Sequence, residues 1–280
     1  MSTPDASDPA VRVSKLGYVG FETPDLDRMI EYYTKILDFS LVDRSAQGAF
    51  LTTTFDHHSV VLTRGDTKAR STVGYEIWEP LDDAQRRLRE AGYEVQRRTD
   101  IAPGTPDVLV LEEPSTGVPL HLFAAQDTSG VEGYPPLRPT KLGHVAAFTS
   151  ALAPMQKFYQ DLLGFKWSDT VGDFFVFLRC SADHHTANFM ASTKYDGMHH
   201  IAYEMRDPNH LISMIDHLGR RSTIGSPGST WTCSRAGAGY LARRLRTAHA
   251  AAHHSIRKIY NLNGIIGPAS LHPFQGSIDQ

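Results

Sequence analysis

Histidines in the second half of this sequence occur in pairs, at places that could build a metal site. His184 and His185 stand together in SADHHTANFM, His199 and His200 follow in MHHIAYEM, and His144 lies upstream in KLGHVAAF. Neutral imidazole is a common metal ligand. Two imidazoles and one carboxylate on one face hold Fe(II) and leave positions open for a substrate and O₂. The sequence therefore indicates a metal site on a sheet, with the His184-His185 pair predicted to lie in a strand.

An internal duplication supports this interpretation. Three pairs of segments match in constant order: residues 15–39 with 141–165, Asp56-His57-His58 with Asp183-His184-His185, and 75–83 with 203–211. The offset in numbering grows by only one from each match to the next, and ten of the 25 positions in the first pair are identical. A near-constant offset over three matches predicts two homologous halves.

Each half has the same predicted order of elements. Residues 15–23 form a short apolar run typical of a strand. Thr23 and Pro24 are predicted to provide the N-cap and first residue of a helix, and apolar residues from Leu26 to Leu37 recur at helical spacing. Further predicted elements are strands at 48–55 and 59–65, a second unit that begins at 73–78, a helix at 81–93, and strands at 107–113 and 117–125. Each half is thus predicted to be built of two βαβββ units in an α+β fold, with the second half incomplete.

The chain is predicted to have five parts. They are an N-terminal tail (1–13), a structural repeat domain (14–125), a Pro/Gly-rich linker (126–140), a metal-site domain (141–218) and an atypical tail (219–280).

The two halves are not equivalent in chemistry. His144 and His200 hold matching places in their two units, since each is followed by a β-branched residue and then Ala. The two side chains would face each other if the units pack as a pseudo-symmetric pair. In the first half Tyr18 takes the place of His144, and nothing like His200 precedes Tyr75. The second half is therefore predicted to carry the site, and the first half to be structural.

This layout resembles the type I extradiol ring-cleavage dioxygenases of the vicinal-oxygen-chelate superfamily. The resemblance covers residues 14–216 and rests on KLGHVAAF, FLRCSADHHTANFM and MHHIAYEM. It implies a glyoxalase-like fold, with His144 and His200 as metal ligands and His185 as a catalytic acid/base that is not a ligand. It further implies Fe(II), or alternatively Mn(II), a catechol-type substrate cleaved by O₂ beside its vicinal hydroxyls, and a homo-oligomer.

The third ligand of that family, a glutamate in the last strand of the second half, has no counterpart here. His121 stands at its place in the first half, and the duplication places His249 at the matching position of the second half. No glutamate follows Glu204. Two hypotheses stay open: a frameshift near residues 218–222 has replaced the native C-terminus, or the tail is genuine and His249 or His253 completes a three-histidine site.

Charge and composition limit the other possibilities. Residues 1–218 hold 20 Lys+Arg against 30 Asp+Glu, and residues 219–280 hold eight against one, for a net charge of -3. This balance argues against a nucleic-acid partner. The sequence has no apolar run of the roughly 18 residues that cross a bilayer, no signal-like N-terminus and only two cysteines. A cytoplasmic protein without membrane contact is expected.

Three functions compete on these residues. The first is an extradiol dioxygenase, and the second is a non-catalytic aromatic-ligand-binding or inactive member of the same superfamily. The third, a glutathione-dependent isomerase, is disfavoured because its ligands would come from both halves and Tyr18 is not a suitable ligand. Several phenylalanines suit either an aryl-binding site or a core: Phe174, Phe175, Phe177 and Phe189.

Overall fold

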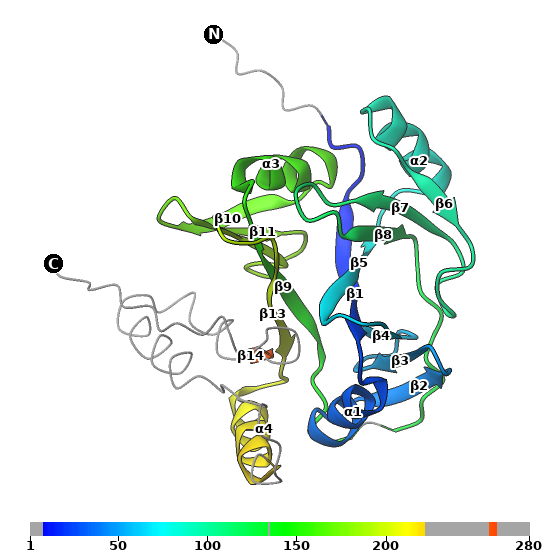
Figure 1. Cartoon of the computed structure of the whole chain (residues 1–280), viewed down its shortest axis with the longest axis vertical. Coiled ribbons are helices and arrows are strands. Elements are labelled where there is room, and N and C mark those ends of the chain that lie inside the picture. The colour runs from blue at the N-terminus through cyan, green and yellow to red at the C-terminus, as the bar shows by residue number, and fades with distance from the viewer. Residues whose placement is uncertain (1–7, 134, 222–257, 262–280) are drawn as a thin grey trace, which may run out of the picture.

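The computed structural model describes residues 8–133, 135–221 and 258–261 of the chain (Figure 1). Two mixed sheets, each belonging to one half of the chain, lie against each other along their central strands. β1 (Val13–Thr23) runs beside β9 (Lys141–Thr149), and β5 (Ala69–Ile77) runs beside β13 (Gly197–Glu204). The predicted α+β fold is confirmed. None of the described helices is long and apolar enough to cross a bilayer.

The first half contains two complete βαβββ units in one eight-stranded sheet. Besides β1 and β5, its elements are α1 (Leu26–Glu31), a π-helical turn (Tyr32–Ile36), β2 (Ser40–Arg44), β3 (Gly48–Thr52), β4 (Val60–Arg64), α2 (Leu81–Glu90), β6 (Gln96–Arg98), β7 (Val108–Glu112) and β8 (Pro119–Phe123). The strand order is β2-β3-β4-β1-β5-β8-β7-β6. β1 pairs antiparallel with β5, and each of these two strands has a parallel neighbour on its other side.

The second half repeats the first unit and the start of the second. Besides β9 and β13, its elements are α3 (Leu152–Lys157), a π-helical turn (Phe158–Leu162), β10 (Lys166–Val171), β11 (Phe175–Arg179), β12 (Ala187–Ala191), α4 (Pro208–Arg221) and β14 (Lys258–Asn261). The strand order is β10-β11-β12-β9-β13-β14. β14 pairs antiparallel with β13. In the first half the strand at the corresponding position is β8, which is parallel to β5. The two sheets therefore differ beside the strand that carries His200.

Two local predictions were wrong. The N-cap of α1 is Asp25, whose side chain accepts a hydrogen bond from the Arg28 amide at 3.1 Å, so Thr23 and Pro24 precede the helix. Residues 181–186 form a bend that leads into β12, so His184 and His185 do not lie in a strand. In that bend the Asp183 amide donates to the Ser181 hydroxyl at 3.3 Å, a side-chain contact that favours a turn over an extended strand.

Two β-bulges shape the central strand pair of the second half. The register between β9 and β13 skips Gly143 on one strand and His199 on the other. Each bulge thus lies one residue before a predicted metal ligand, His144 or His200. A bulge inserts a residue into one strand and redirects the side chains next to it.

The first half has bulges at the matching positions. The register between β1 and β5 skips Gly17 and Ser71, one residue before Tyr18 and Thr72. Gly17 corresponds to Gly143 and Ser71 to His199 at the offsets of the sequence duplication. The duplication therefore preserved the backbone irregularities and changed the side chains that they orient.

A buried polar network joins the two halves. Arg70 forms an ion pair with Glu113, and their side chains are 2% and 0% exposed. The Tyr159 hydroxyl, from the second half, donates to Glu113 at 2.7 Å. Because a buried charge needs a partner and hydrogen bonds, this network fixes how the halves pack.

Candidate metal centre

His144 and His200 approach each other across the β9–β13 ladder. His144 lies opposite Ala202, and His200 lies opposite Ala146, so the two histidines are diagonal neighbours on one face of the sheet. Their Nε2 atoms are 2.9 Å apart, and the ring planes are inclined by 78°. The exposed fractions of His144 and His200 are 1% and 8%. The small side chains of Ala146 and Ala202 leave space for the imidazoles to meet.

This separation fits two ligand positions of one metal ion. Two nitrogens that each bind an ion at about 2.1 Å and at a right angle lie about 3 Å apart. The same distance suits a hydrogen bond from one Nε2–H to the other Nε2. Within the described residues, no group of three or more His, Cys, Asp or Glu side chains could hold a metal ion. His144 and His200 are thus the two predicted ligands that the described residues bring together, and His249 and His253 lie outside the described part of the chain.

His185 lies beside this pair of histidines. Its ring centroid is 4.3 Å from that of His144 and 5.1 Å from that of Phe177. His185 is partly buried, whereas the neighbouring His184 is exposed and lies 3.9 Å from an Asp169 carboxylate oxygen. The bend therefore turns one histidine toward the candidate site and the other toward solvent.

The same face of the sheet carries an aromatic side chain and a buried amide. Phe177 lies opposite Asn188, and Asn188 lies opposite Ala146, so all three share the face of His144. Asn188 is 1% exposed, and its Oδ1 has no hydrogen-bond partner in the described part of the structure. A buried carbonyl oxygen without a partner is destabilising. This amide is thus available to a polar group of a bound molecule.

Only some of the suggested phenylalanines lie on this face. Phe175 packs on Phe177, with ring centroids 4.2 Å apart. Phe189 points to the opposite face and packs on Tyr159 in the core, at 4.7 Å between ring centroids. Phe174 lies in the β10–β11 turn and is 39% exposed.

The equivalent place in the first half is filled by hydrogen-bonded side chains. The Tyr18 hydroxyl lies 2.7 Å from His121 Nδ1, and the Tyr18 ring stacks on Phe123 with centroids 5.6 Å apart. His58, the counterpart of His185, has its ring centroid 4.5 Å from that of Tyr18. Burial lowers the pKa of His58 to about 3, and the neighbouring imidazoles of His57 and His121 lower it in the same direction. The first half therefore has a packed, neutral cluster where the second half has an imidazole pair.

Comparison with known families agrees with this architecture. The sequence profile of the Glyoxalase/Bleomycin resistance protein/Dioxygenase superfamily matches residues 15–131 and 141–241. The chain belongs to this superfamily. Both halves are matched separately, as the duplication predicts.

Curated relatives in this superfamily are dioxygenases. The chain is 26% identical over 132 residues to a 1,2-dihydroxynaphthalene dioxygenase from Sphingobium xenophagum, a match that covers 45% of this chain and 44% of that enzyme. It is 23% identical over 250 residues to a manganese-dependent 2,3-dihydroxybiphenyl 1,2-dioxygenase from Geobacillus genomosp. 3, with 77% of each chain covered. The chain is therefore a distant homologue of extradiol dioxygenases, as the sequence motifs predicted.

Solved structures of the superfamily share the fold. The Mn(II)-bound glyoxalase from Novosphingobium aromaticivorans is 25% identical, with a TM-score of 0.68 over 75% of this chain and 72% of that one. Homoprotocatechuate 2,3-dioxygenase from Arthrobacter globiformis is 22% identical, with a TM-score of 0.69 over 81% of this chain and 76% of that one.

Two features near the candidate centre were missed from the sequence. One is Asn188, whose counterpart in the first half is the apolar Val61. A change from an apolar to a polar residue between the copies was the available signal. The other is a group of charged residues around Lys141, which recurs in the first half at the duplication offsets.

Proposed function

We propose that this chain is an extradiol-type dioxygenase that binds a divalent metal ion through His144 and His200 and a catechol-type ring beside it. The observation that supports this proposal is the 2.9 Å separation of the two Nε2 atoms on one face of the sheet. Fe(II) is the proposed ion, with Mn(II) as the alternative because one relative is a manganese-dependent dioxygenase. The proposal also includes a cytoplasmic location, a homo-oligomeric assembly and no nucleic-acid or membrane partner, which rest on the sequence.

The proposed roles follow from chemistry and position. The bound ion would supply the redox chemistry of O₂ and the ring. His144 and His200 hold the ion as neutral imidazoles. His185 accepts a proton from a ring hydroxyl and returns it, since its ring lies 4.3 Å from that of His144 and imidazole exchanges protons near neutral pH. Phe177, whose ring centroid lies 5.1 Å from that of His185, offers an aromatic surface to the substrate ring.

A second candidate function is aromatic-ligand binding without ring cleavage. It is favoured by the ligand set, because the described residues supply two ligands and the sequence has no glutamate after Glu204. A site that lacks a carboxylate ligand binds Fe(II) more weakly and carries one negative charge less.

Anaerobic reconstitution with Fe(II) or Mn(II) distinguishes these functions. The measurements are the metal content per chain, the binding of catechol, and the formation of yellow ring-opened product from catechol, 2,3-dihydroxybiphenyl and homoprotocatechuate. The dioxygenase proposal expects about one ion per chain and ring opening. Catechol binding without metal or ring opening supports the second candidate, and absence of both metal and catechol binding contradicts both.

Matched variants test the assignment of the ligands. His144→Ala and His200→Ala are expected to abolish metal binding. Tyr18→Phe and Thr72→Ala change the equivalent positions of the first half and are expected to leave the metal content unchanged. Loss of metal in all four variants would indicate a general effect on folding and not loss of a ligand.

A further inference from the structure

A lysine beside the candidate centre is held between two carboxylates. Lys141 Nζ lies 2.6 Å from Asp183 Oδ2 and 3.4 Å from Glu204 Oε2. The side chains of Asp183 and Glu204 are 12% and 13% exposed, and that of Lys141 is 43% exposed. Buried carboxylates need a partner, and ion pairs away from water are screened less than surface pairs. Lys141, Asp183 and Glu204 form a charged triad, which is therefore a stronger contact than an ordinary surface ion pair.

The triad joins the three segments that carry the predicted site residues. Lys141 starts β9, three residues before His144. Asp183 lies in the bend, two residues before His185. Glu204 ends β13, the strand of the second predicted ligand, and lies opposite Lys141 in the ladder. One ammonium group thus connects both ligand strands and the bend of the proposed acid/base.

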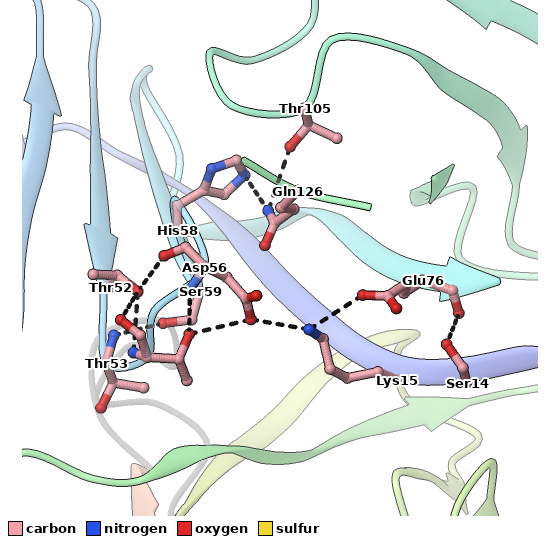
Figure 2. A network of polar contacts seen from close by, with 11 residues as sticks. Ser14, Lys15, Thr52, Thr53, Asp56, His58, Ser59, Glu76, Thr105 and Gln126 are labelled. Atoms are coloured by element: carbon pink, nitrogen blue, oxygen red, sulfur yellow. Dashed lines mark hydrogen bonds and ion pairs between the residues drawn. The ribbon is translucent and has the colours of Figure 1, made fainter. Parts of the chain in front are cut away.

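The first half contains the same triad without the metal-site histidines. Lys15 Nζ lies 3.0 Å from Asp56 Oδ2 and 3.2 Å from Glu76 Oε2, as Figure 2 shows. These three residues are the counterparts of Lys141, Asp183 and Glu204 at the three offsets of the duplication. Recurrence at all three offsets indicates that the triad is part of the structure that the two halves share.

We propose that Lys141 is a positioning residue that holds the bend of His185 against β9 and β13 and so fixes the His185 ring over that of His144. This inference rests on the proposed function, because the role of His185 belongs to it. Burial opposes the charge of Lys141, but the hydrogen bond to Asp183 and the negative charges of Asp183 and Glu204 outweigh it. They raise the pKa of Lys141 above its ordinary value, so its ammonium group stays charged at neutral pH.

The bend in the first half has further support that does not involve Lys15. The Thr52 hydroxyl donates to the Asp56 carbonyl at 2.8 Å, and the amide of His57 donates to the Asp127 carbonyl at 2.8 Å. Figure 2 shows the position of Thr52 beside Asp56. In the second half Arg179 stands at the place of Thr52. We therefore expect the bend at residues 181–186 to depend more on its lysine than the first-half bend does.

The test compares Lys141→Met with its matched control Lys15→Met. The first readout is the imidazole ¹H–¹⁵N NMR spectrum of the metal-free protein, with the His185 signal assigned from a His185→Gln spectrum. Lys141→Met is expected to shift or broaden the His185 signal, Lys15→Met to leave it unchanged, and Lys141→Arg to restore it. The second readout is turnover, where Lys141→Met is expected to lower kcat roughly tenfold to a hundredfold with unchanged metal content.

The possible outcomes separate this inference from the proposed function. An unchanged His185 signal in Lys141→Met, or an equal change in Lys15→Met, would overturn the positioning role. A change of the His185 signal confined to Lys141→Met, in a protein without turnover, would support the positioning role of Lys141 and count against the dioxygenase proposal. If Lys141→Met does not fold, Asp183→Asn removes the negative charge from the stronger contact at unchanged size and gives the same NMR comparison.

Discussion

The buried histidines of the first half should make the folded protein lose stability as the pH falls. His58 and His121 are 0% and 7% exposed. Burial lowers the pKa of His58 to about 3 and that of His121 to about 4, from an ordinary value of 6.5. Nearby positive charges, including Arg98 beside His121, act in the same direction. Below pH 6.5 the unfolded chain therefore binds protons that the folded chain does not bind.

The magnitude follows from these two values. Stability is complete above the pKa of the unfolded histidines and decreases as the pH falls toward the folded values. Each histidine contributes a slope of about 1.4 kcal/mol per pH unit in this window. Lowering the pH from about 7.5 to about 5 should thus remove about 4 kcal/mol through this pair, a large part of the stability of a typical domain.

Urea unfolding at a series of pH values, followed by circular dichroism, measures this slope. His58→Leu is expected to reduce the slope by about 1.4 kcal/mol per pH unit, because one proton is removed from the linkage. The matched control is Val61→Ala, a change in the apolar cluster that contains Tyr18, whose ring contacts that of His58. It should lower the free energy of unfolding by about 1 to 3 kcal/mol at every pH and leave the slope unchanged. Equal slopes in the native protein and His58→Leu would refute the argument, since His58 would then bind its proton equally well in both states.

Three further substitutions test contacts described above. Arg70→Met should lower the free energy of unfolding by about 3 to 5 kcal/mol, since Glu113 stays buried without its cation, and the double variant Arg70→Met/Glu113→Leu should lose less in the same urea assay. Tyr18→Phe should lower it by about 1 kcal/mol through loss of the hydrogen bond to His121; an unchanged midpoint would count against that bond. Asn188→Val should raise the melting temperature, because it removes a buried oxygen without a partner; a decrease would show that the amide is satisfied.

Hydrophobic period and internal repetition predicted most strands and helices, but not the elements that lack an apolar side. The three residues of β6 are all exposed, and β2 is mostly exposed. Such edge strands show no alternation of apolar and polar residues, so their sequence resembles a loop. The bend at 181–186 was missed for a different reason, because this polar stretch directly joins β11 to β12 and was taken as part of a strand, whereas the Ser181 and Asp183 contact turns the chain.

Repetition and resemblance indicated the residues of the candidate centre, whose role as ligands stays a prediction, but not the backbone irregularities that orient them. Repetition indicated that His144 and His200 occupy matching places, and the structure brings their Nε2 atoms to 2.9 Å. Their diagonal relation depends on bulges, which shift a register by one residue and have no sequence signature here. The charged triad was missed because Lys141 and Glu204 become neighbours only through the β9–β13 register.

The duplication explains how one backbone frame serves two purposes. Both halves keep the same bulges and lysine triad, so the side chains after the bulges decide what each half does. In the first half, Tyr18 and His121 satisfy each other within a packed cluster, which favours stability. In the second half, small alanines and the buried Asn188 amide lie beside an imidazole pair, and Asn188 Oδ1 has no hydrogen-bond partner among the described residues. Because unsatisfied buried polar groups lower stability, a chain with two copies of the second arrangement would be less stable than this one. The packed first half thus contributes stability that the second arrangement lacks, and the Arg70–Glu113–Tyr159 network joins the two halves.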